Sequence, residues 1–233
     1  MRQPGLLITG TDTGVGKTFV GCGLAAALRR RGLRVAPFKP AETGCELDSQ
    51  SNALIPADAV LLQHASQTQA ALETICPYRY RMPVAPWVAA QREGGAIDAS
   101  VLQRCYAELA STHDVVIVET AGGILVPLAE QFHYGDLARM LDLPVLVVAG
   151  SKLGVINHTL LTLEYLRSAA LTLLGCVLNH PYGEQGPAVE TNIGALRSLV
   201  ATRLFVLPQL PDGERSGQRE TFDELAEHLL NSL

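Results

Sequence analysis

The chain has 233 residues, of which 48% are hydrophobic and 18% charged, and its formal net charge is −5 at pH 7. This composition favours a chain that buries a sizeable core, and its uniformity along the sequence predicts a single domain over residues 1–233. The sequence has no apolar run of about 18 residues, which argues against a membrane span. It has no block of basic residues, which argues against nucleic acid as a partner.

The first predicted strand leads directly into a glycine-rich loop. The apolar run Gly5–Ile8 precedes the loop Thr9–Thr18, and residues 19–31 predict a helix that follows it at once. Glycines let the backbone turn so that several N–H groups converge on anionic oxygens, and the helix N-terminus adds its positive dipole end. The loop is a variant of G-x-x-x-x-G-K-[ST], because Gly10 comes one residue earlier than this pattern expects. The sequence therefore predicts that the phosphates of a nucleotide bind here.

Two side chains of this loop are candidates for direct roles in binding. Lys17 would lie against the terminal phosphates, and the hydroxyl of Thr18 would lie against a Mg²⁺ ion. The residues expected to cradle the phosphates are Thr13, Gly14, Val15 and Gly16. The alternative is a glycine-rich turn with a surface lysine, but strand, loop and helix all fall where phosphate binding needs them.

A second cation follows the next strand. Residues 34–38 predict this strand, which ends at Lys39, and a polar loop is expected over residues 41–51. Lys39 would stabilise charge on a transferring phosphoryl group, although a surface lysine is the alternative. Residues 57–65 predict a short helix that begins near Asp58, a residue that could hold Mg²⁺ or cap the helix.

The middle of the chain contributes a buried strand that ends in a carboxylate. Residues 77–86 contain several prolines and predict an irregular connection, and residues 98–109 predict a helix. Residues 114–118 form a continuous apolar run, as in buried parallel strands. An unpaired carboxylate at its end would be costly, so Glu119 is expected to bind Mg²⁺, directly or through water, or to pair with a nearby lysine.

The second half of the chain continues the alternation of strands and helices. The expected elements are a strand over 143–149, a helix from Asn157 to 169, a strand over 173–178, a helix over 187–201, a strand over 204–207 and a helix over 221–230. This order predicts an α/β fold of the P-loop NTPase-like class, an open, mostly parallel sheet with helices on both faces. Ligands bind such sheets beyond the carboxyl ends of the strands, where Lys39, Glu119 and Asn179 all fall.

Two asparagines at element ends keep alternative interpretations open. Asn157 would ordinarily cap its helix, but the N-terminus of that helix would also suit a carboxylate ligand. Asn179 could recognise a nucleobase through its amide, or serve a turn.

Cysteine usage indicates the compartment. The five cysteines are scattered and odd in number, which is typical of reduced thiols rather than of a disulfide framework or a zinc site. We therefore expect a cytoplasmic protein.

Six segments of the chain, taken together and in this order, form a specific pattern. They are Gly10–Thr18, Lys39-Pro40 with Thr43-Gly44, Asp58-Ala59, Glu119 with Ala121–Gly123, Lys152–Thr159 and Leu207–Pro211. By this pattern the chain resembles the dethiobiotin synthetase family, in which the longer glycine-rich loop is usual. Two positions depart from the family pattern, Thr120 in place of a glycine and Trp87 in place of a histidine.

The resemblance implies an ATP- and Mg²⁺-dependent enzyme that carboxylates 7,8-diaminopelargonate with CO₂ and closes the ring to dethiobiotin. The expected intermediates are a carbamate and its mixed anhydride with phosphate. Lys17 and Lys39 would be the catalytic cations, because the carbamate and the γ-phosphate are both anionic. Thr18, Asp58 and Glu119 would hold Mg²⁺.

The same resemblance implies a set of binding residues in a homodimer. Thr13, Lys39 and Thr43 would contact the diamine or its carbamate. Asn179 would lie against adenine together with Pro208, Gln209 and Leu210. Gly154, Val155 and Asn157 would reach the site from the partner subunit, where their helix N-terminus would bind the substrate carboxylate.

The main alternative is a P-loop switch ATPase of the partitioning or septum-positioning class. Those proteins usually carry a second lysine early in the loop, and residues 7–14 contain none. An amidating synthetase of cobalamin biosynthesis and a paralogue that binds nucleotide without turnover are further alternatives.

Overall fold

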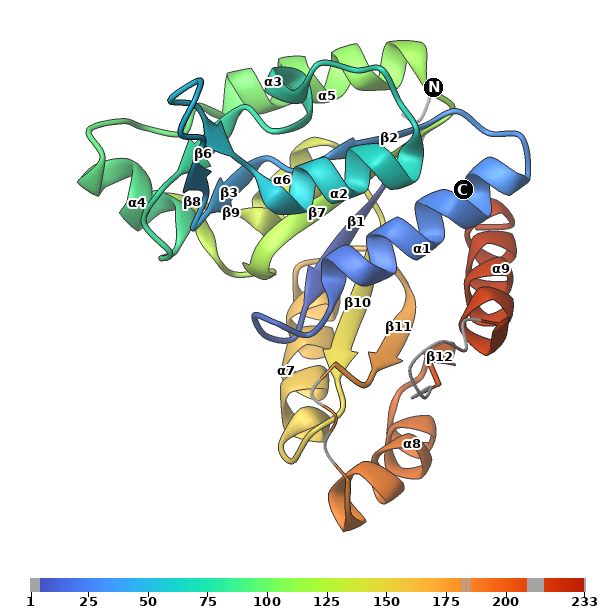
Figure 1. The fold of residues 1–233 in the computed structure, drawn as a ribbon. Helices are drawn as coiled ribbons and strands as arrows, with labels where there is room; N and C mark the ends of the chain where they lie inside the picture. Colours follow the sequence, from blue (N-terminus) through green and yellow to red (C-terminus); the bar gives the residue numbers. More distant parts are fainter. Residues whose placement is uncertain (1–4, 182, 184, 209–215, 233) are drawn as a thin grey trace.

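Six parallel strands form the central sheet of the computed structural model, which describes residues 5–181, 183, 185–208 and 216–232 (Figure 1). Their order in the sheet is β12-β11-β10-β1-β7-β2, and every neighbouring pair is parallel. The strands are β1 (Gly5–Gly10), β2 (Val35–Phe38), β7 (Val115–Gly123), β10 (Val145–Gly150), β11 (Leu173–Asn179) and β12 (Leu204–Val206). The predicted α/β fold with a parallel sheet is confirmed.

Each central strand contributes side chains to two hydrophobic cores. Leu6 and Ile8 of β1 pack in the core on one face, whereas Leu7 between them packs in the core on the other. Successive strand residues point to opposite faces, so a strand covered on both sides must be apolar throughout. This explains why the sequence of β7 shows a continuous apolar run rather than an alternating one.

Helices cover both faces of the sheet. On one face lie α1 (Lys17–Arg30), α2 (Ala57–Ser66) and α9 (Ser216–Leu230). The two helices α1 and α9 approach closely at Gly23, where any larger side chain would overlap the ring of Phe222. The predicted helices of this face are confirmed, but α9 begins at Ser216, five residues before the predicted start.

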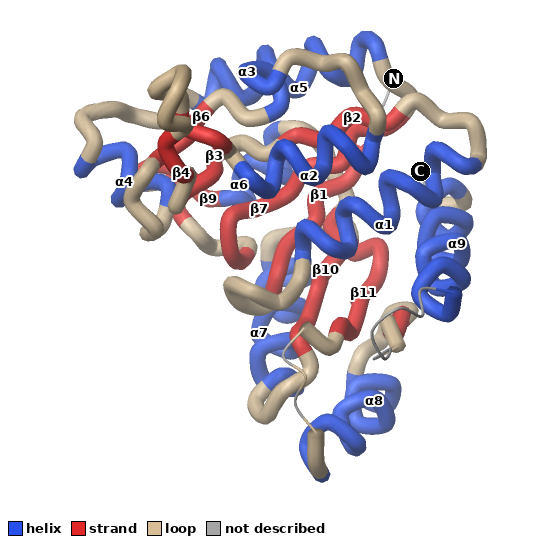
Figure 2. Tube along the Cα trace, in the orientation of Figure 1, coloured by secondary structure: helices blue, strands red, loops and turns tan. Residues whose placement is uncertain are grey.

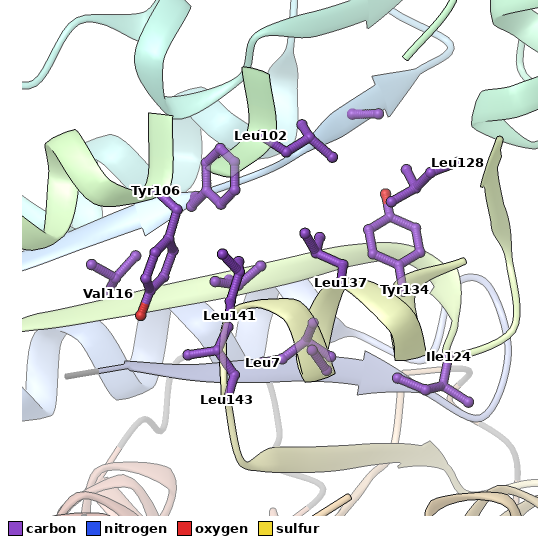
Figure 3. Close-up of a cluster of buried hydrophobic side chains, with 14 of the residues drawn as sticks. Leu7, Leu102, Tyr106, Val116, Ile124, Leu128, Tyr134, Leu137, Leu141 and Leu143 are labelled. Carbon is purple, nitrogen blue, oxygen red and sulfur yellow. The ribbon is translucent and has the colours of Figure 1, made fainter. Parts of the chain in front are cut away.

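The opposite face carries the other core. It is covered by α3 (Leu72–Ile75), α5 (Ala99–Thr112), α6 (Tyr134–Met140) and α7 (Val155–Ser168), with α8 (Pro187–Leu199) packed beside α7. Figure 3 shows Leu102 and Tyr106 of α5 and Leu137 of α6 converging on Leu7 of β1. Side chains from segments far apart in the sequence therefore fix the sheet from this side.

Short elements lie where the sequence predicted irregular structure, over residues 41–51 and 77–86, and where it predicted no element, around residues 54–55 and 127–133. The pairs are β3 (Ala41–Thr43) with β6 (Tyr78–Tyr80), β4 (Glu46–Leu47) with β5 (Leu54–Ile55), and β8 (Pro127–Ala129) with β9 (Phe132–His133), and α4 (Pro86–Arg92) lies near them (Figure 2). The expected loop over residues 41–51 is therefore wrong in part. Within the described ranges, no helix is both long enough and apolar enough to cross a membrane.

The start of α7 also differs from the expectation. The helix begins at Val155, and its N-cap is Gly154 with a φ of 95°. Asn157 is therefore the third residue of the helix and not its cap. A glycine cap leaves no side-chain signal in the sequence, which explains the two-residue error.

Candidate functional site

The glycine-rich loop joins β1 to α1 at the carboxyl edge of the sheet. Gly14 and Gly16 have φ values of 74° and 91°, a left-handed conformation that glycine adopts without strain. A side chain at position 16 would in addition overlap the side-chain nitrogen of Asn179. The tight turn of the loop thus depends on glycine, as the sequence predicted.

Two hydrogen bonds anchor this loop to neighbouring strands. The Thr11 N–H donates to the Val148 carbonyl of β10 at 2.9 Å, and Asn179 Nδ2 donates to the Val15 carbonyl at 2.9 Å. Asn179, which the sequence left open between a nucleobase contact and a turn, therefore supports the loop from the end of β11. Its contact with adenine stays a prediction.

Four elements bring Lys39, Asp58, Glu119 and Thr18 together beside the loop. Lys39 Nζ lies 2.9 Å from Asp58 Oδ2 and 2.5 Å from Glu119 Oε1. The Thr18 hydroxyl donates to the same Glu119 oxygen at 2.9 Å. Lys39 is 2% exposed and Glu119 is fully buried. The structure thus places in contact four residues that are separated by up to 101 positions, and it rules out a surface location for Lys39.

The two lysines of the site have pKa values shifted in opposite directions. Burial, and then the charge of Lys39, lowers the pKa of Lys17 to about 8. Burial also acts to lower the pKa of Lys39, but the charges of Glu119 and Asp58 outweigh it and raise that pKa above its usual range. Lys39 is therefore protonated at neutral pH, whereas Lys17 is close to its titration range.

The donor set beside the loop fits Mg²⁺. Asp58 is ionised, because the effect of Lys39 outweighs burial and lowers the pKa of the carboxyl group. Thr18 gives its hydroxyl hydrogen to Glu119, so its lone pairs are free for a cation. Glu119 Oε2 is buried with no hydrogen-bond partner among the described residues. One or two carboxylates with waters and phosphates suit Mg²⁺, and a cluster of three or more His, Cys, Asp or Glu is not found in the described part of the chain.

Thr18, Lys39 and Asp58 border a cavity of about 560 Å³. The predicted site residues that line it are Thr13, Gly14, Gly16, Lys17, Thr18, Lys39, Thr43 and Asp58. Residues 83–86 and 120–122 complete the wall, and among them the Thr120 hydroxyl donates to the Gly122 carbonyl at 2.7 Å.

Some predicted residues lie away from this cavity. Val15 is buried under the loop, and Glu119 lies behind Thr18. Gly154, Val155 and Asn157 are not part of the cavity wall within one chain. Pro208 follows β12, and Gln209 and Leu210 fall outside the described residues.

Glu42 is a functional candidate that sequence reasoning missed. It lies on β3 within the segment expected to be a polar loop, yet it is 6% exposed and lines the cavity. Its carboxylate accepts hydrogen bonds from the backbone N–H groups of Asp58 and Ala59. Asp58 and Ala59, to which Glu42 is hydrogen-bonded, are 16 and 17 residues away, so the local sequence does not reveal this contact. Its position beside Thr43 is the only sequence signal that could have pointed to Glu42.

Comparison with known proteins identifies relatives over most of the chain. A family model described as an AAA domain matches residues 4–216. The ATP-dependent dethiobiotin synthetase BioD of Anaeromyxobacter dehalogenans strain 2CP-C is 43% identical over 209 residues, which cover 89% of this chain and 91% of that protein. The BioD protein of Bacillus licheniformis is 38% identical over 89% of this chain and 87% of its own length. That of Xanthomonas oryzae pv. oryzae strain PXO99A is also 38% identical, over 94% of this chain and 97% of its own length.

Solved structures with the same fold have low sequence identity. The MinC:MinD cell division complex of Aquifex aeolicus matches with a TM-score of 0.60 at 15% identity, covering 98% of this chain and 96% of that chain. The septum site-determining protein MinD of Pyrococcus horikoshii, complexed with Mg-ADP, matches with a TM-score of 0.56 at 18% identity. The match covers 97% of this chain and 96% of that chain. These likenesses show the fold alone. The relatives at 38% to 43% identity decide the family, and the chain belongs to the ATP-dependent dethiobiotin synthetases.

Proposed function

We propose that this chain uses ATP and Mg²⁺ to carboxylate 7,8-diaminopelargonate with CO₂ and to close the cyclic urea of dethiobiotin. One observation carries the proposal: Lys17, Lys39 and Thr18 border a single cavity together with Asp58. Two cations and a metal-binding donor set suit a reaction in which a carbamate and a triphosphate, both anionic, must meet.

The reaction has three bond-forming steps. One amine of the diamine adds to CO₂ and loses a proton, which gives a carbamate. A carbamate oxygen attacks the γ-phosphorus of ATP and ADP leaves. The second amine then attacks the carbonyl carbon, and inorganic phosphate departs with the former carbamate oxygen. Lys17 and Lys39 would offset the charge that gathers when carbamate and phosphate approach.

The residues beside the loop would hold Mg²⁺ through Thr18, Asp58 and Glu119, and Glu119 also orients the Thr18 hydroxyl. When bound, the ion would neutralise charge on the phosphates. Lys39 contacts both carboxylates, so it stands next to the position where metal and γ-phosphate would meet.

The substrate would lie between the glycine-rich loop and β3, where Thr13 and Thr43 offer hydroxyl groups to the cavity. We further propose a homodimer in which Gly154, Val155 and Asn157 of one chain complete the cavity of the other. Leu153 next to this segment is 84% exposed and Leu161 on α7 is 62% exposed, which suits a face that a second copy covers. Five cysteines without a disulfide suit a cytoplasmic location.

Phosphate release with one component omitted at a time tests the proposal. Release should require ATP, Mg²⁺, the diamine and CO₂ together, and dethiobiotin should appear in equal amount by mass spectrometry. ATP hydrolysis that ignores the diamine but rises with DNA or lipid vesicles would instead support the switch ATPase.

A further inference from the structure

The first turn of α2 has no side-chain cap of its own. Its N-cap is Pro56, which offers no side-chain acceptor and makes no capping hydrogen bond. Asp58, in the first turn, directs its carboxylate at Lys39 instead. Because the first N–H groups of a helix have no intrahelical partners, α2 needs acceptors from another segment.

Glu42 supplies these acceptors from β3. Its Oε1 accepts from the Asp58 N–H at 2.9 Å, and its Oε2 accepts from the Ala59 N–H at 3.0 Å. Hydrogen bonds to a charged acceptor are stronger than neutral ones, and a carboxylate at a helix N-terminus is further favoured by the dipole. With 6% exposure, Glu42 makes these bonds under little competition from water.

The two bonds connect two walls of the cavity. Asp58 is held at its backbone by Glu42 and at its carboxylate by Lys39. Thr43, the neighbour of Glu42 on β3, lines the same cavity. Loss of the Glu42 bonds would free the start of α2, and the Asp58 carboxylate would move with it.

We propose that Glu42 is a positioning residue, whose two-oxygen contact with the start of α2 keeps Asp58 aimed at the Mg²⁺ site. The proposal builds on the proposed function, since it acts through a metal ligand assigned there. Glu42 itself contacts no reacting atom in this account.

Glu42→Gln is the sharpest variant, because it keeps the shape of the side chain but replaces one accepting oxygen with a donor. ADP affinity is measured by calorimetry with and without Mg²⁺. The gain in affinity that Mg²⁺ gives should fall about three- to tenfold, while Mg²⁺-free ADP affinity stays as in the wild type. Glu46→Gln is the matched control, since Glu46 is exposed on β4 and should leave both affinities unchanged.

A double-mutant cycle separates positioning from general damage. If Glu42 acts through Asp58, the combined Glu42→Gln and Asp58→Asn variant should lose no more Mg²⁺-dependent affinity than Asp58→Asn alone. The proposal would be overturned if the double variant lost the product of the two single losses in Mg²⁺-dependent affinity. It would also be overturned if Glu42→Gln lowered Mg²⁺-free ADP affinity as much as affinity with Mg²⁺. Glu42→Asp, which keeps the charge but shortens the reach, should behave like Glu42→Gln and serves if the latter does not fold.

This experiment is independent of the overall reaction. ADP binding needs neither diamine nor CO₂, so failure of the proposed function leaves the positioning result intact. Conversely, an active enzyme with normal Mg²⁺ dependence in Glu42→Gln would overturn only the role of Glu42.

Discussion

Lys17 and Lys39 show how burial alone does not decide the charge of a side chain. Both residues are at most 7% exposed. Lys39 contacts two carboxylates and keeps its proton. Within the described part of the chain, Lys17 makes one side-chain hydrogen bond, to the Asp12 carbonyl at 3.5 Å, and it lies near another cation. Lys17 is therefore poised for an anionic ligand, since phosphates would add to the negative charge of Glu119, Asp58 and Asp12, which burial and Lys39 outweigh.

The lowered pKa of Lys17 predicts a pH dependence of nucleotide binding. Above its pKa of about 8 the side chain loses its charge, so ATP affinity should fall as pH rises, by up to about tenfold per pH unit. Calorimetry from roughly pH 7 to roughly pH 9 measures this. Lys17→Met lacks the titrating group, so its weaker affinity should stay flat over the same range. A flat wild-type profile would remove the charge of Lys17 from binding.

Lys39 should matter for turnover more than for binding. We expect Lys39→Met to bind ATP within about threefold of the wild type but to lose about a hundredfold or more in kcat, because charge on the transferring phosphoryl group is no longer stabilised. The unfolding temperature should also fall, because the carboxylates of Asp58 and Glu119 lose their buried partner. Added Mg²⁺ should restore part of this fall in unfolding temperature. Steady-state kinetics and thermal unfolding measure both effects, and an unchanged kcat would contradict the role.

At the scale of elements, the glycine-rich loop is held by its own backbone and by the ends of β10 and β11. These anchors fix the direction of the loop N–H groups before a nucleotide arrives. Because these N–H donors already point in the required direction, little free energy is needed to rearrange them when the charged phosphates bind.

A pair of glycine variants tests this rigidity. Gly16→Ala should abolish measurable ATP binding, because a methyl group there is strained at a φ of 91° and overlaps Asn179. Gly14→Ala should weaken binding only modestly, since its φ of 74° brings a similar strain but no described atom lies within 4 Å of the added methyl. Equal ATP affinity of the two variants in calorimetry would show that contact with Asn179 is unimportant.

The sequence predicts the long elements well and the short ones poorly. Continuous apolar runs mark β7 and β10, because both faces of these strands are covered. The strands β3 and β6 have three residues each and pair across a separation of 37 positions, so their sequences carry no local signal. Glu42 was missed for the same reason, whereas Lys39 and Glu119 could be predicted because each directly follows an apolar run in the sequence.

At the scale of the molecule, the cavity is built by one chain at the carboxyl edge of its sheet, while α7 begins elsewhere on that edge. The proposed homodimer accounts for residues 154–157, which otherwise have no role at the cavity. It also accounts for the exposed leucines beside them.

A charge on that face should separate the subunits. Leu153→Glu would place a carboxylate at an 84% exposed position in the proposed interface, and burying it there is costly. Sedimentation should show a dimer for the wild type and a monomer for the variant, with Mg-ADP affinity kept and turnover lost. Leu47→Glu, at an exposed position on β4, is the control. A monomeric wild type with full activity would contradict the shared site.

Whether oxygen passes from CO₂ to phosphate distinguishes activation of a carbamate from simple hydrolysis of ATP. In rapid-quench reactions with C¹⁸O₂, ATP, Mg²⁺ and the diamine, activation of a carbamate carries one labelled oxygen into each inorganic phosphate released. Singly labelled phosphate is expected in the same amount as dethiobiotin. Unlabelled phosphate would mean that water, not a carbamate, attacks ATP at this site, and the proposed reaction would then be wrong.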